Sequence, residues 1–270
     1  MSAVVVLVGC GNMGFAMLNG WLADDPALTV HVIEPALALR ERAIGLGAIG
    51  HEMPATVPAD LVPDLVFLAV KPQAMGEVVP AYAGWAGGSV TFVSIAAGTT
   101  MDALGKMLPG RTAIIRCMPN TPAAIGAGMM VCCANDATSD AARALASRLL
   151  ASSGLVDWID DEALMDVVTA VSGSGPAYVF HMIECLAAAG VVAGLPEPLA
   201  LRMAMQTVAG AGRLASEATD PPGLLREQVT SPGGTTAAAL GVLMSEQGLQ
   251  PLMTRAVAAA RDRGVELGKA

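Results

Sequence analysis

The chain has 270 residues, which suffices for one large domain or for two smaller ones. Hydrophobic residues make up 54% of it, but glycines and prolines interrupt the longest uncharged stretches, so we expect no membrane-spanning segment and no membrane partner. A net charge of −9 and an aromatic content of 3% argue against nucleic acid as a partner.

Cysteine usage and the first residues of the chain indicate its compartment. The five cysteines are odd in number and form no C-x-x-C pair, so we predict neither a disulfide framework nor a metal site. We interpret them as small core residues. The apolar run at the start of the chain lacks the basic residues that lead a signal peptide, because the first Lys or Arg is Arg40. We therefore expect a cytoplasmic protein.

The first half of the chain alternates short apolar runs with helix-like segments, which is the pattern of a parallel sheet covered by helices on both faces. It predicts an N-terminal doubly wound α/β domain of the Rossmann type over residues 1–160, followed by a different kind of domain. The predicted strands are Val4–Val8, Thr29–Ile33, Leu65–Val70, Val90–Ile95, Ala113–Cys117, Met129–Cys133 and Leu155–Ile159, with a helix over Thr138–Ser153.

The strand pattern stops at about Asp161, and long segments rich in Ala, Leu and Met follow. They predict an all-helical domain over residues 161–270. Within it, Gly175–Gly194 has a single formally charged residue, Glu184. A helix that is apolar on all sides has to be buried, and this small domain cannot enclose it alone. We therefore expect a partner subunit, in a homodimer or a higher oligomer of dimers.

A G-x-G-x-x-G motif, Gly9, Gly11 and Gly14, follows the first strand and opens a helix. These glycines suit a tight turn, the close approach of a pyrophosphate and tight helix packing. Glu34 ends the second strand, where a carboxylate accepts hydrogen bonds from the adenine ribose and repels a 2′-phosphate. Glu34 thus favours NADH, whereas Arg40 and Arg42 on the next helix either reach a 2′-phosphate of NADPH or are solvated charges.

In an open parallel sheet, ligands bind beyond the carboxyl ends of the strands. We therefore expect the dinucleotide at the glycine turn and at the loops that follow the other central strands. In one of these loops, Lys71 either contacts phosphate or ribose, or is an ordinary solvated lysine. The predicted cofactor-binding residues are Val8, Gly9, Cys10, Gly11, Asn12, Met13, Gly14, Glu34, Ala69, Val70, Lys71, Pro72, Ala96 and Ala97.

Three further strings distinguish the chain: RCMPNTP at residues 116–122, VSGSGPAY at 171–178 and VTSPGGTT at 229–236. Together with GCGNMG and AVKP, in this order and at these spacings, they closely resemble the Δ1-pyrroline-5-carboxylate reductase family. The resemblance extends from Val4 to Lys269. The S-P-G-G-T-T string before a helix is the most specific of these motifs, and G-x-G-x-x-G is the least specific.

The resemblance implies reduction of a cyclic imine acid by NADPH or NADH to L-proline, the last step of proline synthesis. It also implies a helical domain whose dimer forms part of each active site. By this resemblance Gly234, Thr235 and Thr236 bind the substrate carboxylate through their backbone, and Thr236 is the catalytic residue, with its hydroxyl against the ring nitrogen. Glu34 departs from the family pattern, in which a small polar residue suited to NADPH is common.

The residues agree with this chemistry, because a protonated imine is already electrophilic and needs mainly orientation and a hydrogen bond at nitrogen. We interpret His31 on a strand, His51 in a Pro-rich loop and His181 in the buried helix as structural. A β-hydroxyacid dehydrogenase-like oxidoreductase is an alternative, but it uses a catalytic lysine of the helical domain, where only Lys269 is present. A non-enzymatic dinucleotide-sensing protein is another, and it would not need residues 231–236.

Overall fold

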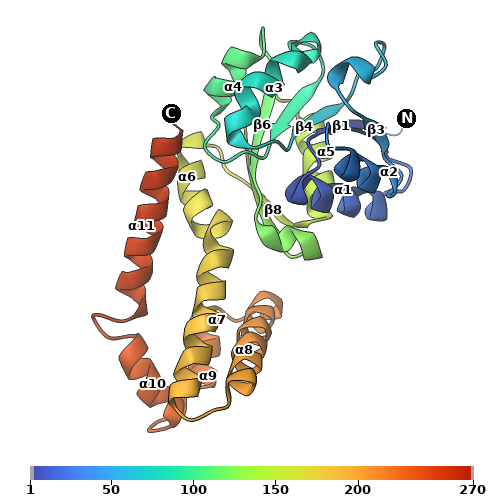
Figure 1. Cartoon of the computed structure of the whole chain (residues 1–270). Coiled ribbons are helices and arrows are strands. Elements are labelled where there is room, and N and C mark those ends of the chain that lie inside the picture. The colour runs from blue at the N-terminus through green and yellow to red at the C-terminus, as the bar shows by residue number, and fades with distance from the viewer. Residues whose placement is uncertain (1–2, 269–270) are drawn as a thin grey trace. The chain divides into compact units, whose positions relative to one another are not determined.

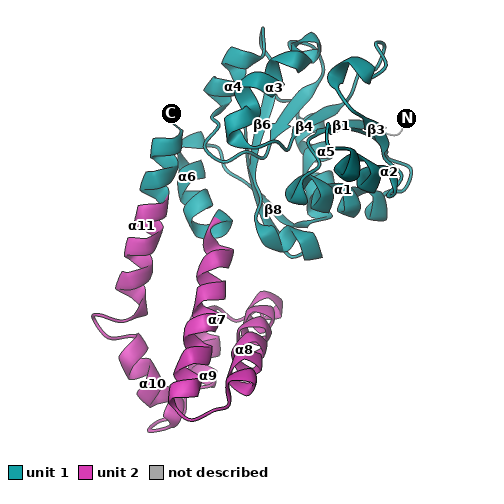
Figure 2. Ribbon diagram, viewed as in Figure 1, with its two compact units in different colours: residues 1–173, 261–270 teal, residues 174–260 magenta. Residues whose placement is uncertain are grey.

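The computed structural model describes residues 3–268 (Figure 1). Lys269, on which the dehydrogenase alternative depends, lies outside the described residues. The chain divides into two compact units, which Figure 2 colours separately. Unit 1 consists of residues 1–173 and 261–270, and unit 2 of residues 174–260.

Unit 1 is built on an eight-stranded sheet with the strand order β3-β2-β1-β4-β5-β6-β7-β8. Neighbouring strands are parallel except for β6 and β7. The Rossmann-type doubly wound sheet predicted from the sequence is confirmed. Its strands are β1 (Val4–Val8), β2 (Thr29–Ile33), β3 (Ile49–His51), β4 (Leu65–Leu68), β5 (Thr91–Ser94), β6 (Ala113–Met118), β7 (Gly128–Ala134) and β8 (Gly154–Trp158).

Two features of the sheet differ from the prediction. Strand β3 was not predicted, and it places His51 at the end of a strand rather than in a loop. Strand β7 runs antiparallel to β6, because residues 119–127 are too short a connection for the crossover that a parallel pair requires.

The sheet is buried on both faces by helices. Phe67 of β4 belongs to the apolar core that contains Trp21 of α1 and Leu149 of α5, whereas its neighbour Val66 belongs to the core that contains Leu104 of α4. Successive residues of a strand point to opposite faces, so the two cores lie on the two sides of the sheet. The helices of unit 1 are α1 (Asn12–Asp24), α2 (Leu37–Ile44), α3 (Met75–Val78), α4 (Met101–Met107), α5 (Asp140–Ala151) and α6 (Met165–Val168).

Short helical turns complete the connections of unit 1. Five are 3₁₀ turns and the last is a π-helical turn that continues α6. They are η1 (Pro54–Thr56), η2 (Pro72–Ala74), η3 (Val79–Trp85), η4 (Thr121–Ile125), η5 (Glu162–Leu164) and η6 (Thr169–Gly173).

Unit 2 is all-helical, as predicted. It contains α7 (Gly175–Val192), α8 (Glu197–Glu217), α9 (Pro222–Gln228), α10 (Thr235–Leu243) and most of α11 (Leu249–Leu267), whose last turns belong to unit 1. The residues of α7 and α8 pack against each other. Of the described residues of unit 2, only Ala200 and Ala204 are buried.

Helix α7 is exposed in the single chain. The continuous helical stretch Glu162–Val192 has the length and a mean hydropathy, 1.4, at which a helix can cross a membrane, and none of its most apolar window is buried. His181 and Cys185 on α7 are exposed as well, contrary to the prediction that they are buried. The physical reason is that one chain alone provides no cover for this helix, while the other four cysteines are in the core of unit 1 as predicted.

Candidate active site

The glycine turn between β1 and α1 is too tightly packed for side chains at two of its three glycines. Gly9 has a φ of +85°, and a Cβ there would lie 2.9 Å from the carbonyl oxygen of Ala69. A Cβ on Gly14 would lie 2.5 Å from the carbonyl oxygen of Gly9. Both contacts are shorter than real Cβ contacts. The turn therefore requires glycine at both positions for the backbone alone.

Gly11 is different, because no atom lies within 4 Å of the Cβ position there. It is the N-cap of α1, whose first residue is Asn12. The N–H groups of the first turn of a helix have no partner within the helix, and they carry its positive dipole end. This open position beside the first turn of α1 fits an anion such as a pyrophosphate.

The Glu34 carboxylate lies at the end of β2 and is hydrogen bonded to backbone on both oxygens. The side chain is buried, with 7% of the residue exposed. Oε2 accepts from the backbone N–H of Cys10 at 2.8 Å, and Oε1 accepts from that of Ala36 at 3.0 Å. These bonds fix a negative charge directly beside the glycine turn.

Arg40 and Arg42 are both bound to backbone beside that carboxylate rather than simply solvated. Arg40 donates to the carbonyl oxygen of Glu34 at 2.7 Å. Arg42 donates to the carbonyl oxygen of Cys10 at 3.4 Å, and its guanidinium carbon lies 3.7 Å from the centre of the Phe15 ring, a cation–π contact. Positive and negative side chains therefore share this end of the glycine turn.

The Cys10 thiol within this turn stays neutral. Burial raises its pKa to about 11, with Glu34 adding to the rise and Arg42 opposing it. The thiolate is the reactive form of cysteine, so this thiol is not activated as a nucleophile. The contribution of Cys10 that the structure shows is its backbone N–H, which donates to Glu34.

The other predicted cofactor-binding loops lie at the same edge of the sheet. Val8 pairs with Leu68 and Leu68 with Ser94 in parallel register, so β1, β4 and β5 end side by side. The loops that contain Ala69–Pro72 and Ala96–Ala97 begin at these ends. Lys71 is exposed at the N-cap of η2, so both interpretations of this lysine stay open.

The predicted substrate-binding residues lie in unit 2, at the start of α10. Gly234 is the N-cap and Thr235 the first helical residue, so neither threonine is the cap. Gly233 has a φ of +69°, which closes the turn before the helix. Within residues 3–268, the Thr236 hydroxyl has no hydrogen-bond partner. The first-turn N–H groups and this hydroxyl are thus available to a ligand.

Sequence reasoning assigned no role to three polar residues of unit 1. Arg116 of β6 is 5% exposed, and its Nη1 lies 2.6 Å from Oε1 of Glu162. Asn120 donates to the carbonyl oxygen of Ser172 at 3.1 Å and accepts from the backbone N–H of Met129 at 2.9 Å. The available signal was the RCMPNTP string, which places an arginine and an asparagine at the end of an apolar strand.

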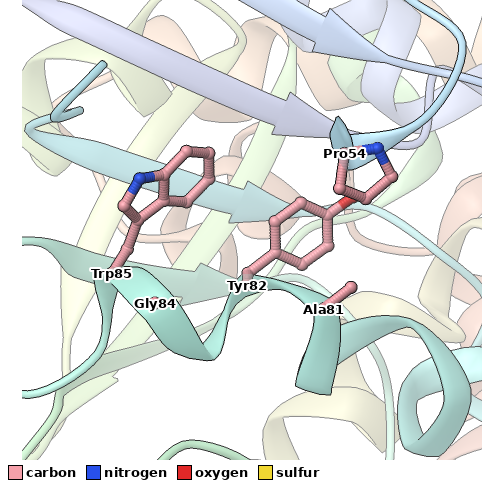
Figure 3. A pocket seen from close by; sticks show the side chains of 5 residues that line it. All are labelled: Pro54, Ala81, Tyr82, Gly84 and Trp85. Atoms are coloured by element: carbon pink, nitrogen blue, oxygen red, sulfur yellow. The ribbon is translucent and has the colours of Figure 1, made fainter. Parts of the chain in front are cut away.

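A separate small cavity lies away from the glycine turn, and Figure 3 shows its lining. It has a volume of about 130 Å³ and is lined by Pro54, Ala81, Tyr82, Gly84 and Trp85. The rings of Tyr82 and Trp85 stack with centroids 5.8 Å apart. Burial raises the pKa of the Tyr82 hydroxyl, so the lining offers no acid or base at neutral pH.

A doubly wound sheet with an open glycine turn after its first strand, followed by an all-helical unit, is the architecture of NAD(P)-dependent oxidoreductases. Two family models match the chain accordingly. Residues 4–98 match the model for NADP oxidoreductase, coenzyme F420-dependent, and residues 162–267 match the model for pyrroline-5-carboxylate reductase dimerisation. The chain belongs to the pyrroline-5-carboxylate reductase family, and its dimerisation domain identifies it as a homodimer.

Full-length relatives support this membership. The chain is 39% identical to pyrroline-5-carboxylate reductase of Pseudomonas aeruginosa over 98% of this chain and 97% of the relative. It is 40% identical to that of Synechocystis over 100% of both chains. The structure of the Coxiella burnetii enzyme has a TM-score of 0.94 at 32% identity, with 100% of both chains covered. The Plasmodium falciparum enzyme, solved with NADP bound, has a TM-score of 0.81 at 27% identity and 98% coverage of both.

Proposed function

We propose that the chain reduces 1-pyrroline-5-carboxylate to L-proline with the dinucleotide on the glycine turn and the substrate at the start of α10. The activity itself, NAD(P)H-dependent reduction in proline biosynthesis, follows from family membership. The observation that carries the placement of the substrate is the free Thr236 hydroxyl beside the first-turn N–H groups of α10. A glycine turn alone would suit many dinucleotide enzymes, whereas this helix start suits a small carboxylate.

In the cofactor half, we assign the pyrophosphate to the backbone of the glycine turn. Its support is the open position at Gly11 beside the first turn of α1. We assign the adenine ribose to Glu34, and the ribose–nicotinamide half to Ala69–Pro72 and Ala96–Ala97, because these loops share one edge of the sheet. When bound, the dinucleotide supplies the hydride.

In the substrate half, the backbone N–H groups of Thr235 and Thr236 bind the carboxylate. The N–H of Gly234, predicted to join them, already donates to the carbonyl oxygen of Ser231 at 3.0 Å, so Gly234 serves the site by leaving room beside the helix start. The Thr236 hydroxyl oxygen accepts from the N–H of the protonated ring nitrogen and orients the C=N bond. The imine is protonated before reduction, so the hydride adds to its carbon and the C=N electron pair moves to nitrogen. A secondary amine results without a further acid or base from the chain.

We propose that NADH is used at least as well as NADPH. Glu34 supports this preference, because its buried carboxylate lies where a 2′-phosphate would approach and is held by two backbone N–H groups. Arg40 and Arg42 have polar partners of their own at this site, the carbonyl oxygens of Glu34 and Cys10. A guanidinium has five N–H donors, so these bonds orient the two arginines without using all of their donors, and the preference rests on Glu34.

We further propose that residues 1–160 serve the dinucleotide and residues 161–270 the substrate and the dimer. A partner subunit, rather than lipid, covers the apolar surface of α7, since the dimerisation match includes the whole of this helix. Dimers are the minimum assembly, and they can associate further. We place the enzyme in the cytoplasm, where its unpaired thiols remain reduced.

Steady-state turnover of 1-pyrroline-5-carboxylate by the purified chain, with NADH and with NADPH, tests this account. We expect proline formation with both cofactors and a kcat/KM for NADH at least equal to that for NADPH. Absence of turnover would reject the placement of substrate and cofactor together. A kcat/KM for NADPH more than about tenfold higher, roughly 1.4 kcal/mol, would reject the cofactor preference alone.

A further inference from the structure

The mechanism does not use the most buried ion pair of unit 1, between Arg116 of β6 and Glu162 of η5. Arg116 is 5% exposed, and its Nη1 lies 2.6 Å from Oε1 of Glu162. The same Oε1 also accepts from the backbone N–H of Met101, at 2.7 Å. One carboxylate oxygen thus joins a central strand to the start of helix α4.

Met101 is the first residue of α4, and its N–H has no partner within the helix. Glu162 provides that partner from a position 61 residues away in sequence. The Thr100 hydroxyl accepts from the backbone N–H of Ala103 at 3.1 Å and so caps the same turn. Two side chains therefore fix the start of α4: Thr100, which is local in sequence, and Glu162, which is distant.

The start of α4 is also the end of the segment 95–100, which follows β5. At its other end the segment is bound to the sheet, where Ile95 donates to the carbonyl oxygen of Leu68 at 3.2 Å. Between the two ends, Gly98 has a φ of +72°. A cavity of about 190 Å³ borders the segment at Gly98 and Thr100 and reaches Arg116 and Asp166. Ala96 is buried in an apolar core and Gly98 lies against Leu267 of α11, so the segment is packed there. The cavity borders its last part, where the bond from Met101 to Glu162 fixes the start of α4.

We propose that Glu162 is a positioning residue for hydride transfer. By accepting from Met101, it sets where the half-buried Ala97 lies, since Ala96 is already held in the apolar core, and Arg116 orients its carboxylate for this bond. This inference rests on the proposed contact of Ala96–Ala97 with the ribose–nicotinamide half of the dinucleotide. A displacement of that half of about 1 Å relative to the imine is enough to lower the rate strongly.

Two substitutions at Glu162 separate this role from simple charge compensation. Glu162→Asp keeps a negative charge for Arg116. Because its side chain is shorter by one methylene group, its carboxylate no longer reaches the N–H of Met101. Glu162→Gln keeps an oxygen at the same reach and removes the charge. Positioning predicts that Glu162→Asp lowers kcat and raises KM for the dinucleotide, with kcat/KM down at least about tenfold. It predicts that Glu162→Gln stays within about threefold of the wild type.

Either of two results would overturn the proposal. One is a Glu162→Asp enzyme whose kcat/KM is within about threefold of the wild type, and the other is a Glu162→Gln enzyme whose kcat/KM falls as strongly as that of Glu162→Asp. Thermal melts of both variants are recorded alongside, since charge compensation alone would make Glu162→Gln the less stable of the two. Asp102→Asn is the matched control, because it breaks an exposed ion pair with Lys106 on the same helix. We expect it to leave both kcat and KM unchanged.

Ala97→Val tests the underlying proposed function separately. If it leaves KM for the dinucleotide unchanged, the segment 95–100 does not contact the cofactor, and the proposed placement of the cofactor fails. If Ala97→Val raises that KM while Glu162→Asp does not, only the positioning role of Glu162 is overturned.

Discussion

The two units of the chain use their apolar residues in opposite ways. In unit 1 the sheet carries an apolar core on each face, and large side chains such as Trp21, Phe67 and Phe92 are fully buried. In unit 2 only Ala200 and Ala204 are buried among the described residues, while Phe180 of α7 remains 59% exposed. Unit 1 thus encloses its own core, and the apolar surface of unit 2 lacks cover within one chain.

This difference explains how the two halves of the proposed active site are stabilised. The glycine turn and Glu34 are fixed by contacts within unit 1, such as the bond from the Cys10 N–H to the Glu34 carboxylate. The helix start at Gly234–Thr236 lies in a unit whose apolar surface is completed by dimerisation. Disruption of the dimer should therefore damage the substrate half far more than the dinucleotide half.

The largest effect is expected from Gly14→Val, because even a Cβ at Gly14 would lie 2.5 Å from the carbonyl oxygen of Gly9. The turn would have to open, and we expect dinucleotide affinity to fall roughly 1000-fold, about 4 kcal/mol. Fluorescence titration with the reduced dinucleotide measures this loss. Gly11→Ala is the control: it should leave the melting temperature unchanged, since nothing lies within 4 Å of its Cβ. Normal dinucleotide affinity in Gly14→Val would refute the described turn.

A smaller effect is expected from Phe180→Asp on the exposed surface of α7. A charge in an apolar interface is strongly unfavourable, and we expect the dimer dissociation constant to rise roughly 100-fold, about 2.7 kcal/mol. Light scattering and kinetics at several concentrations should show monomers that bind dinucleotide but turn over slowly. Gln247→Asp, which adds the same charge in the exposed turn between α10 and α11, should remain dimeric. An active dimer of Phe180→Asp would contradict an interface at this residue.

Glu34→Ser changes the dinucleotide half without touching the dimer. Loss of the carboxylate removes both the hydrogen-bond acceptor for the ribose and the repulsion of a 2′-phosphate. We expect the ratio of kcat/KM for NADPH to that for NADH to rise roughly tenfold, about 1.4 kcal/mol. Kinetics with both cofactors measure the ratio. An unchanged ratio would remove Glu34 from cofactor selection.

The smallest effect concerns the pH dependence of unit 1. His31 is 6% exposed, and its Nδ1 lies 2.9 Å from Nε2 of His51. Burial lowers the pKa of His31, and His51 lowers it further. The neutral ring is therefore favoured in the folded state, so its stabilisation is present above the unfolded pKa of about 6.5 and is lost as the pH falls through the lower folded pKa.

His31→Gln tests this expectation, because it removes the titrating ring at a buried position. Between pH 7 and about pH 5, we expect the melting temperature of the wild type to fall by about 2–4 °C more than that of His31→Gln. Parallel pH profiles of the two proteins would contradict a neutral buried His31.

Much of the fold could be predicted from the sequence, because long apolar runs with clear boundaries specify strands directly. The bounds of β1 and β2 agree with the prediction to the residue. Strand β3 could not be predicted, since its Ile-Gly-His sequence is too short for a pattern. Apolar runs also carry no information on strand direction, and only the short connection after Met118 indicated that β7 is antiparallel.

The candidate site was predictable where a local motif dictates a backbone shape, as at Gly9 and Gly14. It was not predictable where the contacts join distant residues. Arg116 and Glu162 are 46 residues apart in sequence, and no spacing rule connects them. The same holds for the bond between the Glu34 carboxylate and the Cys10 N–H, although the position of Glu34 at a strand end was readable.

The central claim is that the substrate nitrogen meets the Thr236 hydroxyl of unit 2, while the dinucleotide is bound by unit 1. The kcat/KM for 1-pyrroline-5-carboxylate of Thr236→Ala, compared with Thr236→Ser, tests it most directly. We predict that Thr236→Ala loses roughly 10- to 1000-fold, about 1.4–4 kcal/mol, while dinucleotide affinity and melting temperature stay unchanged and Thr236→Ser retains much of the rate. The N-cap position of α10 is Gly234, and no side chain caps the helix, so stability does not depend on the Thr236 hydroxyl. A Thr236→Ala enzyme with near-normal kcat/KM would contradict the account.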